Sequence, residues 1–275
     1  MLGLLLLQVL ASCLWLAHTE VVTSFASCPQ FFYAGTTPND VLNPQNAAWI
    51  CQFFSNKHHF ATLYDRDRRI PVYSAYVYEP GNKRPSARWF VEPQLMNKNY
   101  LRDMEREETL MQKYKLTLED IKKSQAVEED YKVLTGLDRG HLTPSGHMND
   151  IKSKAATFTL TNVVPQDSSL NNGQWNVYEF KTMSNNAKGC TRTYVITGAV
   201  PGNTKVAGER VNRPSHIWSA ACCLGKTGPR DAWGAIAEND KNQVENLKLG
   251  ELEDRLTALY RGRRVTLFNN ACPRK

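Results

Sequence analysis

The sequence predicts an α+β protein. Strand-like and helix-like segments follow one another without the regular alternation that a parallel α/β sheet produces. Most of the charged, helix-forming residues are gathered in one stretch, residues 97–130, and no internal repeat or low-complexity linker divides the chain. A length of 275 residues is compatible with one large domain or two small ones. We assign residues 20–275 to a single domain.

In the first half of the chain, the strand signal is strongest at residues 70–80, where apolar residues alternate with small or polar ones. Residues 81–87 have the composition of a loop. Residues 88–95, RWFVEPQL, then predict a return to the sheet. Residues 97–130 predict one or two exposed helices or a mobile insertion, because runs of charge most simply form a solvated surface.

In the second half, residues 194–202 combine a strand pattern with a turn, and residues 216–223 and 232–237 predict two further strands. Residues 239–260 carry apolar residues at helical spacing, interrupted by Gly250, and predict a helix. The apolar positions are Val244, Leu247, Leu252, Leu256 and Leu259.

The N-terminus has the pattern of a secretory signal peptide. Residues 1–19 contain no Lys, Arg, Asp or Glu, and residues 2–16 form an apolar block that is short for a membrane span. Ala17 and Thr19 suit the positions before a cleavage site that follows Thr19. An uncleaved anchor is the alternative. No later stretch is apolar enough to span a bilayer, so we expect a secreted mature chain.

Cysteine usage agrees with export. Six cysteines remain once Cys13 leaves with the signal peptide, and an even number in an exported chain predicts three disulfides. A bond between the neighbours Cys222 and Cys223 would be strained, but the sequence does not choose among the other pairings. A zinc site is the weaker alternative, because no CxxC or HxxxH spacing occurs.

The formal net charge of +7 favours polyanionic partners without choosing among nucleic acid, acidic glycans and anionic lipid. A more specific signal lies in residues 136–150, GLDRGHLTPSGHMND, which place an acid, a guanidinium, a glycine and an imidazole side by side. His141 can act as a base near neutral pH, and Arg139 offers a planar set of donors for phosphate. Asp138 is able to orient the histidine or to brace a turn, and Gly140 allows close backbone approach or a bend.

Residue types alone leave a structural turn as the simpler interpretation of this run. The spacing of further motifs is more specific, because DRGH is followed by TNVVPQ and then by N-x-G-x-W-x-x-x-E. In that order, the chain resembles the DNA/RNA non-specific endonuclease family, whose sites have the ββα-metal (His-Me finger) architecture. The matching positions are Asp138, Arg139, Gly140, His141, Asn162, Pro165, Gln166, Asn171, Gly173, Trp175 and Glu179.

The flanking segments narrow the resemblance. FFYAG, FATLYDRDRRIPVYSAY, RWFVEPQL, ATFTLTN and AACC are similar to the vertebrate endonuclease domain-containing 1 branch of the family, which is secreted. Some members of that branch have lost the acid and the histidine of the DRGH run, whereas this chain keeps both. The resemblance implies a central antiparallel or mixed sheet flanked by helices and stabilised by disulfides.

The resemblance also implies roles for individual residues. His141 would be the general base, and Asn171 would be the one direct protein ligand of Mg²⁺, with Mn²⁺ as a substitute. A neutral amide oxygen suits a hard cation that keeps most of its waters. Glu179 would hold one of those waters. If residues 171–179 form a helix, the two side chains differ by about 12 Å of rise and about 80° of rotation, so they share a side but not a first coordination shell.

Four more residues complete the implied site. Asn162 would position the histidine or the waters on the metal, and Arg139 would contact the phosphate or the transition state. Arg88 would supply a second arginine, although its local spacing differs by about one residue from the family pattern. Asp138 and Gly140 would shape the site rather than react.

Simpler structural interpretations stand beside each of these roles. Asn162 could satisfy backbone groups, Asn171 could cap a helix, and Glu179 could be a solvated helix residue. We interpret His147 as a satisfied surface or core histidine and Trp175 as a core residue rather than a base-stacking platform.

Three functions are therefore compared. The first is a secreted Mg²⁺-dependent endonuclease that hydrolyses DNA and RNA with little sequence specificity. The second is a catalytically silent secreted binding or regulatory module on a nuclease scaffold. The third is a phosphodiesterase or phosphatase that acts on a smaller substrate. The retained His141 and Asn171 favour the first.

Overall fold

A computed structural model describes residues 20–83, 85–86 and 88–275. The predicted signal peptide, residues 1–19, lies outside the described residues. Eight strands form the central sheet in the order β1-β2-β3-β4-β7-β10-β11-β12, and each neighbouring pair is antiparallel. The strands are β1 Val21–Val22, β2 Ala47–Phe54, β3 Lys57–Asp65, β4 Ile70–Val77, β7 Arg192–Val200, β10 His216–Gly225, β11 Gly228–Glu238 and β12 Glu245–Lys248.

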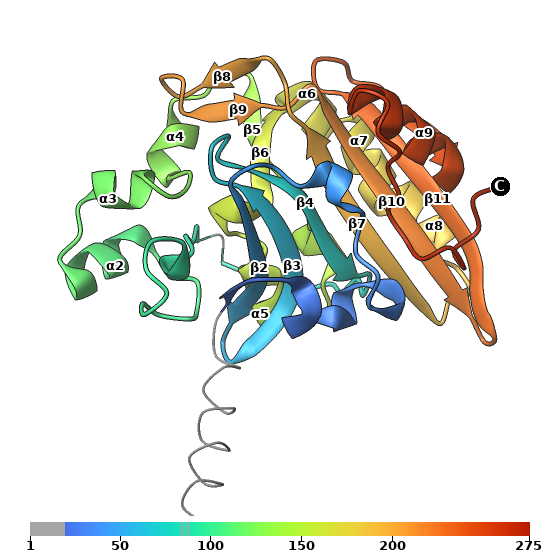
Figure 1. The fold of residues 1–275 in the computed structure, drawn as a ribbon, viewed down its shortest axis with the longest axis horizontal. Helices are drawn as coiled ribbons and strands as arrows, with labels where there is room; N and C mark the ends of the chain where they lie inside the picture. Colours follow the sequence, from blue (N-terminus) through green and yellow to red (C-terminus); the bar gives the residue numbers. More distant parts are fainter. Residues whose placement is uncertain (1–19, 84, 87) are drawn as a thin grey trace, which may run out of the picture.

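Both faces of the sheet are covered, as Figure 1 shows. On one face, α9 packs against β10 and β11, and the four short 3₁₀ turns that precede β2 contribute residues to the same apolar layer. The second face holds α5 to α8 and the hairpin β5-β6. The elements of the first face are α9 Leu249–Leu259 and the turns Phe25–Ser27, Pro29–Phe31, Tyr33–Gly35 and Asp40–Leu42. Those of the second are β5 Leu137–His141, α5 Ile151–Ala156, β6 Val163–Asp167, α6 Ser168–Asn172, α7 Gln174–Val177, the π-helical turn Tyr178–Thr182 and α8 Met183–Asn186.

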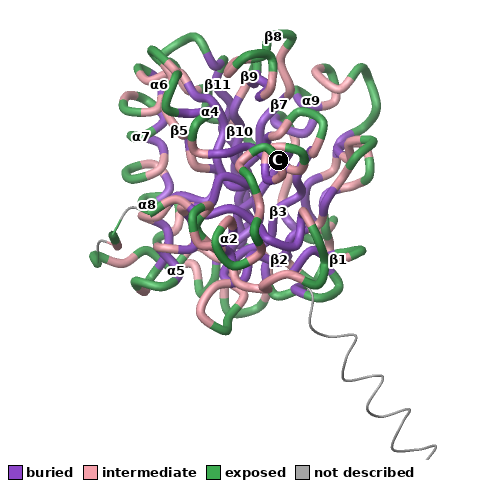
Figure 2. Tube along the Cα trace, turned by 90° about the vertical axis from the view of Figure 1, so that its left-hand side faces the viewer, coloured by how far each residue is buried: buried purple, intermediate pink, exposed green. Residues whose placement is uncertain are grey.

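The core therefore has two apolar layers, one on each face, with the central strands buried between them (Figure 2). Successive side chains of a strand point to opposite faces. In β10, Trp218 belongs to the layer beneath α9, whereas Ile217 belongs to the layer that holds the hairpin.

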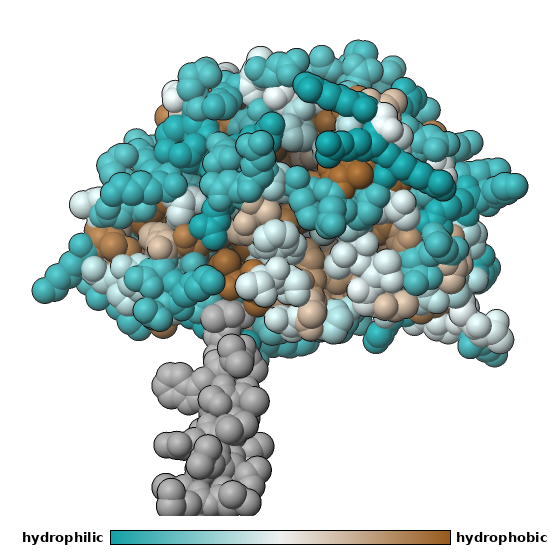
Figure 3. Space-filling model, viewed as in Figure 1, coloured by the Kyte–Doolittle hydropathy of each residue, from teal (hydrophilic) through white to brown (hydrophobic). Residues whose placement is uncertain are grey.

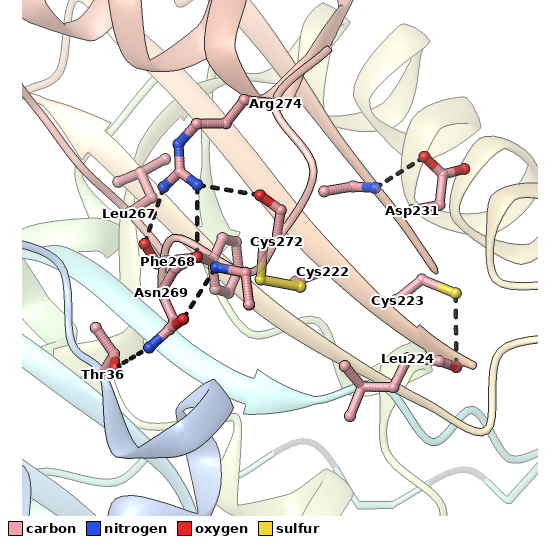
Figure 4. Close-up of a disulfide and its surroundings, with 12 residues drawn as sticks. Thr36, Cys222, Cys223, Leu224, Asp231, Leu267, Phe268, Asn269, Cys272 and Arg274 are labelled. Atoms are coloured by element: carbon pink, nitrogen blue, oxygen red, sulfur yellow. Dashed lines mark hydrogen bonds between the residues drawn. A yellow bond between two sulfur atoms is a disulfide. The ribbon is translucent and has the colours of Figure 1, made fainter. Parts of the chain in front are cut away.

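The same alternation decides the disulfides. Cys222 faces the α9 side and bonds to Cys272, whereas Cys223 faces the opposite side and bonds to Cys190. Figure 4 shows Cys272 held beside Cys222 by the Arg274 guanidinium, which donates to the carbonyl oxygens of Phe268 and Cys272. The third bond joins Cys28 to Cys51. The prediction of three disulfides is confirmed, and the six sulfur atoms leave no thiolate for a zinc site.

Two predicted elements differ from the structure. Residues 88–95 do not join the sheet; Phe90 and Val91 form only isolated bridges, to Thr159 and Glu105. Residues 239–260 are not one helix, because residues 245–248 pair with β11 as strand β12 and the helix begins at Leu249. In both segments the apolar residues were recognised correctly, but long-range pairing decided the backbone conformation.

The sequence predicts one or two exposed helices or a mobile insertion for residues 97–130; the structure has three short helices there, at one end of the sheet (Figure 1). The helices there are α2 Glu107–Tyr114, α3 Leu118–Lys122 and α4 Glu128–Lys132. The surface in Figure 3 is mostly hydrophilic, with separate apolar patches. Among the described residues, no helix is long and apolar enough to cross a membrane.

Close packing of the sheet predicts a strong effect at Gly198 in β7. A Cβ atom at this position would lie 2.2 Å from the Trp218 ring and 2.6 Å from the Val72 carbonyl oxygen. Gly198→Ala should therefore lower the free energy of unfolding by about 3 kcal/mol, measured by urea denaturation. Gly225→Ala is the control, because the nearest atom to a Cβ there is 3.4 Å away. Equal stability of the two variants would contradict this packing.

Candidate active site

The predicted site residues lie on a hairpin and the helices that follow it. β5 pairs with β6 in antiparallel register, so Asp138 is opposite Gln166 and His141 is opposite Val163. α6 begins directly after β6, because the Asp167 side chain accepts hydrogen bonds from the first backbone N–H groups of the helix. The arrangement is a ββα unit, as the sequence predicted.

Gly140 is fixed by its neighbour on β6. A Cβ atom at Gly140 would meet the side chain of Gln166, which is fully buried. Both polar atoms of the Gln166 amide lack a hydrogen-bond partner among the described residues. A glycine is needed because Gln166 occupies the space on that side of β5, between Arg139 and His141.

His141 is half-buried between two aromatic rings. Its ring centroid lies 5.0 Å from that of Phe158 and 5.6 Å from that of Trp89. Burial, reinforced by the charge of Arg139, lowers the pKa of His141 to about 4, and a backbone hydrogen bond at Arg139 opposes this change. The imidazole is consequently neutral at pH 7 and able to accept a proton. Its Nε2 atom is buried without a hydrogen-bond partner in the described part of the chain.

Arg139 lies beside the same aromatic surface. Its guanidinium carbon is 4.8 Å from the centroid of Trp89 and 5.8 Å from that of Tyr131. One nitrogen donates to the Glu128 carbonyl oxygen, whereas Nε has no partner among residues 20–83, 85–86 and 88–275. Arg88 is exposed and adjoins Trp89 in the chain. Arg139 thus lies beside the tryptophan that contacts His141, and Arg88 precedes that tryptophan in the chain.

Asp138 connects β5 to the helix. Its Oδ2 accepts hydrogen bonds from Asn171 Nδ2 at 2.9 Å and from Asn172 Nδ2 at 2.7 Å. Its Oδ1 accepts one from Ser168 Oγ at 2.8 Å. The amide nitrogen of Asn171 is thereby committed to the carboxylate, and its carbonyl oxygen accepts no hydrogen bond from the described residues. Asn171 does not cap either neighbouring helix, since Asp167 and Gly173 hold those positions.

The helix after Asn171 is interrupted, contrary to the continuous helix considered from the sequence. Gly173 has φ −104° and ψ −115°, and α7 starts again at Gln174. Any Cβ at Gly173 would collide with Asn242 Oδ1 and the Ser169 carbonyl oxygen, each 2.3 Å away. The rise and rotation expected for an unbroken helix therefore do not apply between Asn171 and Glu179. Trp175 is buried in the core, as predicted.

Glu179 follows in the π-helical turn and is partly buried. Burial raises the pKa of its carboxyl group to about 8, and the neighbouring Trp175 indole opposes the shift. A cation close to this carboxyl group would favour its ionised form. Helical turns of the π type occur often at functional sites.

His147 is a satisfied core histidine, as interpreted from the sequence. Its Nδ1 and the Tyr76 hydroxyl are 2.9 Å apart, and its Nε2 lies 2.9 Å from the Glu179 carbonyl oxygen. This contact joins the loop after His141 to the turn that carries Glu179. His141 therefore lies, along the chain, between the Asp138–Asn171 contact and the His147–Glu179 contact.

Asn162 is fully buried, and both ends of its amide are used. Its Oδ1 accepts hydrogen bonds from the Thr143 N–H and the Ser74 hydroxyl, and its Nδ2 donates to the carbonyl oxygens of Thr143 and Thr157. Asn162 braces the backbone that follows His141. It makes no hydrogen bond to His141, Asn171 or Glu179 within the described residues.

Several contributors were not singled out from the sequence. Trp89, Tyr131 and Phe158 form the aromatic wall of the site, and their apolar signal did not distinguish them from core residues. Ser168 and Asn172 complete the environment of Asp138. No cluster of three His, Cys, Asp or Glu residues suited to a metal occurs in the described residues, which is compatible with a cation held by a single amide and waters.

The hairpin, the helix and the sheet now define the class of protein. Residues 37–271 match the DNA/RNA non-specific endonuclease family, and the chain belongs to that family.

Among characterised relatives, the chain is similar to the Homo sapiens endonuclease domain-containing 1 protein, with 31% identity over 92% of this chain and 49% of the relative. The Mus musculus protein of that name is 32% identical over 83% of this chain and 45% of its own length. The chain therefore spans about half the length of these relatives. A shorter match, 50% identical over 56 residues, joins it to the mitochondrial nuclease EXOG of Homo sapiens and covers 20% of this chain and 15% of that one.

A solved structure, of the EndoG/EndoGI complex, has the same fold. One of its chains superimposes with a TM-score of 0.52, covering 85% of this chain and 90% of that chain at 16% identity. The predicted α+β fold, with a central antiparallel sheet, flanking helices and disulfides, is confirmed.

The Asp138 contacts generate a stability prediction. Asp138→Ala would leave the Asn171 amide nitrogen unpaired in a partly buried position, so the free energy of unfolding should fall by about 2 kcal/mol. Urea denaturation without divalent cations measures this change. Asp254→Ala is the matched control, because Asp254 is an exposed aspartate on α9. If the Asp138→Ala protein is as stable as this control, the Asp138 carboxylate does not stabilise the packing of α6 against β5.

Proposed function

We propose that the chain is a secreted, Mg²⁺-dependent endonuclease that hydrolyses the phosphodiester bonds of DNA and RNA with little sequence specificity. His141 acts as the general base and Asn171 as the direct ligand of the cation. The observation that carries this proposal is a neutral imidazole beside an arginine whose Nε has no partner among the described residues, on a strand whose Asp138 orients the Asn171 amide.

The environment of His141 supports its role. A base must be unprotonated before the reaction and close to the attacking water. The aromatic wall keeps the imidazole neutral, and the residue as a whole remains partly exposed. After His141 takes the proton of the water, the positive charge on the ring is next to a phosphate that gains negative charge. Arg139 and Arg88 contribute donors to the same phosphate.

The residues around Asn171 fit a magnesium ion. Its carbonyl oxygen is free of hydrogen bonds from the described residues, while Asp138 fixes the amide nitrogen. At metal sites, a ligand is commonly oriented by a hydrogen bond to a carboxylate that does not itself bind the metal. Glu179 is expected to hold a water of the hydration shell. When bound, Mg²⁺ neutralises charge on the phosphate and on the leaving oxygen.

Non-specific recognition of nucleic acid agrees with a net charge of +7. Contacts to the phosphate backbone carry affinity without sequence information, and they weaken with salt. Export is supported by the signal-like N-terminus and by three disulfides, which form in oxidising compartments.

The proposed roles predict the result of two substitutions. His141→Ala should lower cleavage of plasmid DNA and of RNA by at least about 100-fold, because a general base contributes that much. Asn171→Ala should cause a loss that higher Mg²⁺ concentration partly restores. Cleavage is measured on agarose gels with and without EDTA. The folded state of each variant is checked by its thermal unfolding transition.

His216→Ala is the control for these variants. His216 is also on a strand, where its pairing partners, Glu238 of β11 and Val200 of β7, are not proposed site residues. Cleavage by the His141→Ala protein at the rate of this control would remove His141 from the mechanism. Cleavage in EDTA at the full rate would remove the cation.

The aromatic wall predicts a change in the pKa of His141. Replacement of Phe158 by leucine opens one side of the imidazole to water, so the pKa should rise from about 4 toward 6.5. The parent ring then stays neutral throughout pH 5–7, whereas the Phe158→Leu ring becomes partly protonated as the pH falls through that range. NMR titration of the imidazole measures this directly. Phe32→Leu, in the layer on the other face, should leave the pKa unchanged.

A further inference from the structure

Residue Glu20, the first residue after the predicted signal peptide, is fully buried. Its backbone nitrogen donates to Gln94 Oε1 at 2.7 Å, and its carbonyl oxygen accepts a hydrogen bond from the Cys51 N–H at 2.9 Å. The next two residues pair with the edge of β2. The start of the predicted mature chain is thus fixed against the sheet.

The Glu20 side chain meets a second buried acid. Glu92 is also fully buried, and the Oε2 atoms of both carboxyl groups are buried without a hydrogen-bond partner among the described residues. Burial, with a smaller effect from Glu92, raises the pKa of Glu20 well above its usual value. Burial also raises the pKa of Glu92, although the neighbouring Glu20 and hydrogen bonds from the Thr159 and Thr161 hydroxyls oppose the shift. Two neighbouring buried carboxyl groups do not readily ionise together, so we expect this pair to hold one proton and one negative charge.

The charged groups next to this pair oppose one another. Arg102 and Asp103 are both close enough to act on the pair, but their charges are opposite. The Arg102 guanidinium lies 3.7 Å above the Phe53 ring rather than on a carboxylate. A buried negative charge without a close positive partner is costly.

We propose that Glu20, Glu92 and Gln94 form a site for the α-ammonium group that signal-peptide cleavage creates at Glu20. Hydrolysis by a signal-peptide-cleaving protease breaks the Thr19–Glu20 amide bond and consumes one water. The water oxygen joins the Thr19 carbonyl carbon to form a carboxylate, and both water protons go to the nitrogen, which becomes the Glu20 ammonium. The ammonium donates to Gln94 Oε1 and offsets the single negative charge of the acid pair.

This site is connected to the wall of the proposed active site. Glu92 Oε1 accepts hydrogen bonds from the hydroxyls of Thr159 at 2.7 Å and Thr161 at 3.0 Å. Those threonines flank Leu160 and lie between Phe158, which contacts His141, and Asn162, which braces the backbone after His141. Binding of the new N-terminus would therefore make residues 158–162, which support His141, more rigid. The inference rests on the proposed export and cleavage after Thr19, not on nuclease activity.

The test uses the full chain expressed in secreting cells. Insertion of Gly-Ser between Thr19 and Glu20 keeps the residues before the cleavage site and leaves the secreted protein with an extended N-terminus. The parent should begin at Glu20 with a free amine, as read by N-terminal sequencing. Its melting temperature should exceed that of the extended protein by at least about 4 °C. Gly-Ser inserted after Gly208, in an exposed turn, is the control and should have a smaller effect.

The amine itself provides a second measurement. At pH 7, an amine-reactive acylating reagent should label the parent N-terminus at least about tenfold more slowly than the extended one, because one pKa unit changes the free amine tenfold. The backbone amides of Phe90 and Leu160, which pair Phe90 with Phe158 and Leu160, should exchange hydrogen faster in the extended protein. These measurements need neither metal nor nucleic acid, so they are independent of whether the protein cleaves DNA.

Glu92→Gln tests whether the acid pair is the partner. In that background, the Gly-Ser extension should lower the melting temperature by less than half as much as in the parent. An equally large effect would reject Glu92 as the partner of the ammonium. A secreted chain that starts elsewhere or has a blocked first residue would overturn the proposal, as would equal labelling rates and equal melting temperatures of the parent and extended proteins.

Discussion

The hydrogen bonds of one carboxylate, Asp138, determine how the site is assembled. Asp138 is on the strand that carries His141, and it binds three side chains of α6, including Asn171. A hairpin and a short helix have few apolar contacts with which to fix their relative position. A partly buried carboxylate with three donors supplies that constraint, because a charge-assisted hydrogen bond is stronger than a neutral one. It also commits the Asn171 nitrogen and leaves the oxygen free.

The rest of the site follows from burial. A histidine in water would be substantially protonated at mildly acidic pH, whereas the rings of Trp89 and Phe158 exclude enough water to keep His141 neutral. Burial of Glu179 in its own surroundings raises the pKa of that carboxyl group. The fold thus adjusts a base and an acid in opposite directions with apolar groups. The contact between the His147 ring and the Glu179 carbonyl oxygen then joins the loop after His141 to the turn that carries Glu179.

The sheet is the element to which the other segments are attached. Its adjacent cysteines, Cys222 and Cys223, secure the two faces separately, one to the C-terminal segment and the other to the end of the helical region before β7. On the opposite edge, Glu20 and the Cys28–Cys51 bond fix the start of the chain to β2. Glu92 connects that edge to the threonines behind His141.

The sequence by itself determined the α+β class, most central strands, the number of disulfides and the family, because each depends on local periodicity, cysteine count or spaced motifs. It also indicated which residues are able to react. Only the tertiary structure decided the cysteine pairing, the interruption at Gly173 and the fate of residues 88–95 and 245–248. These features depend on partners distant in the chain, such as Asn242 beside Gly173. The neutral state of His141 likewise required rings from two separate segments, so no local pattern contained it.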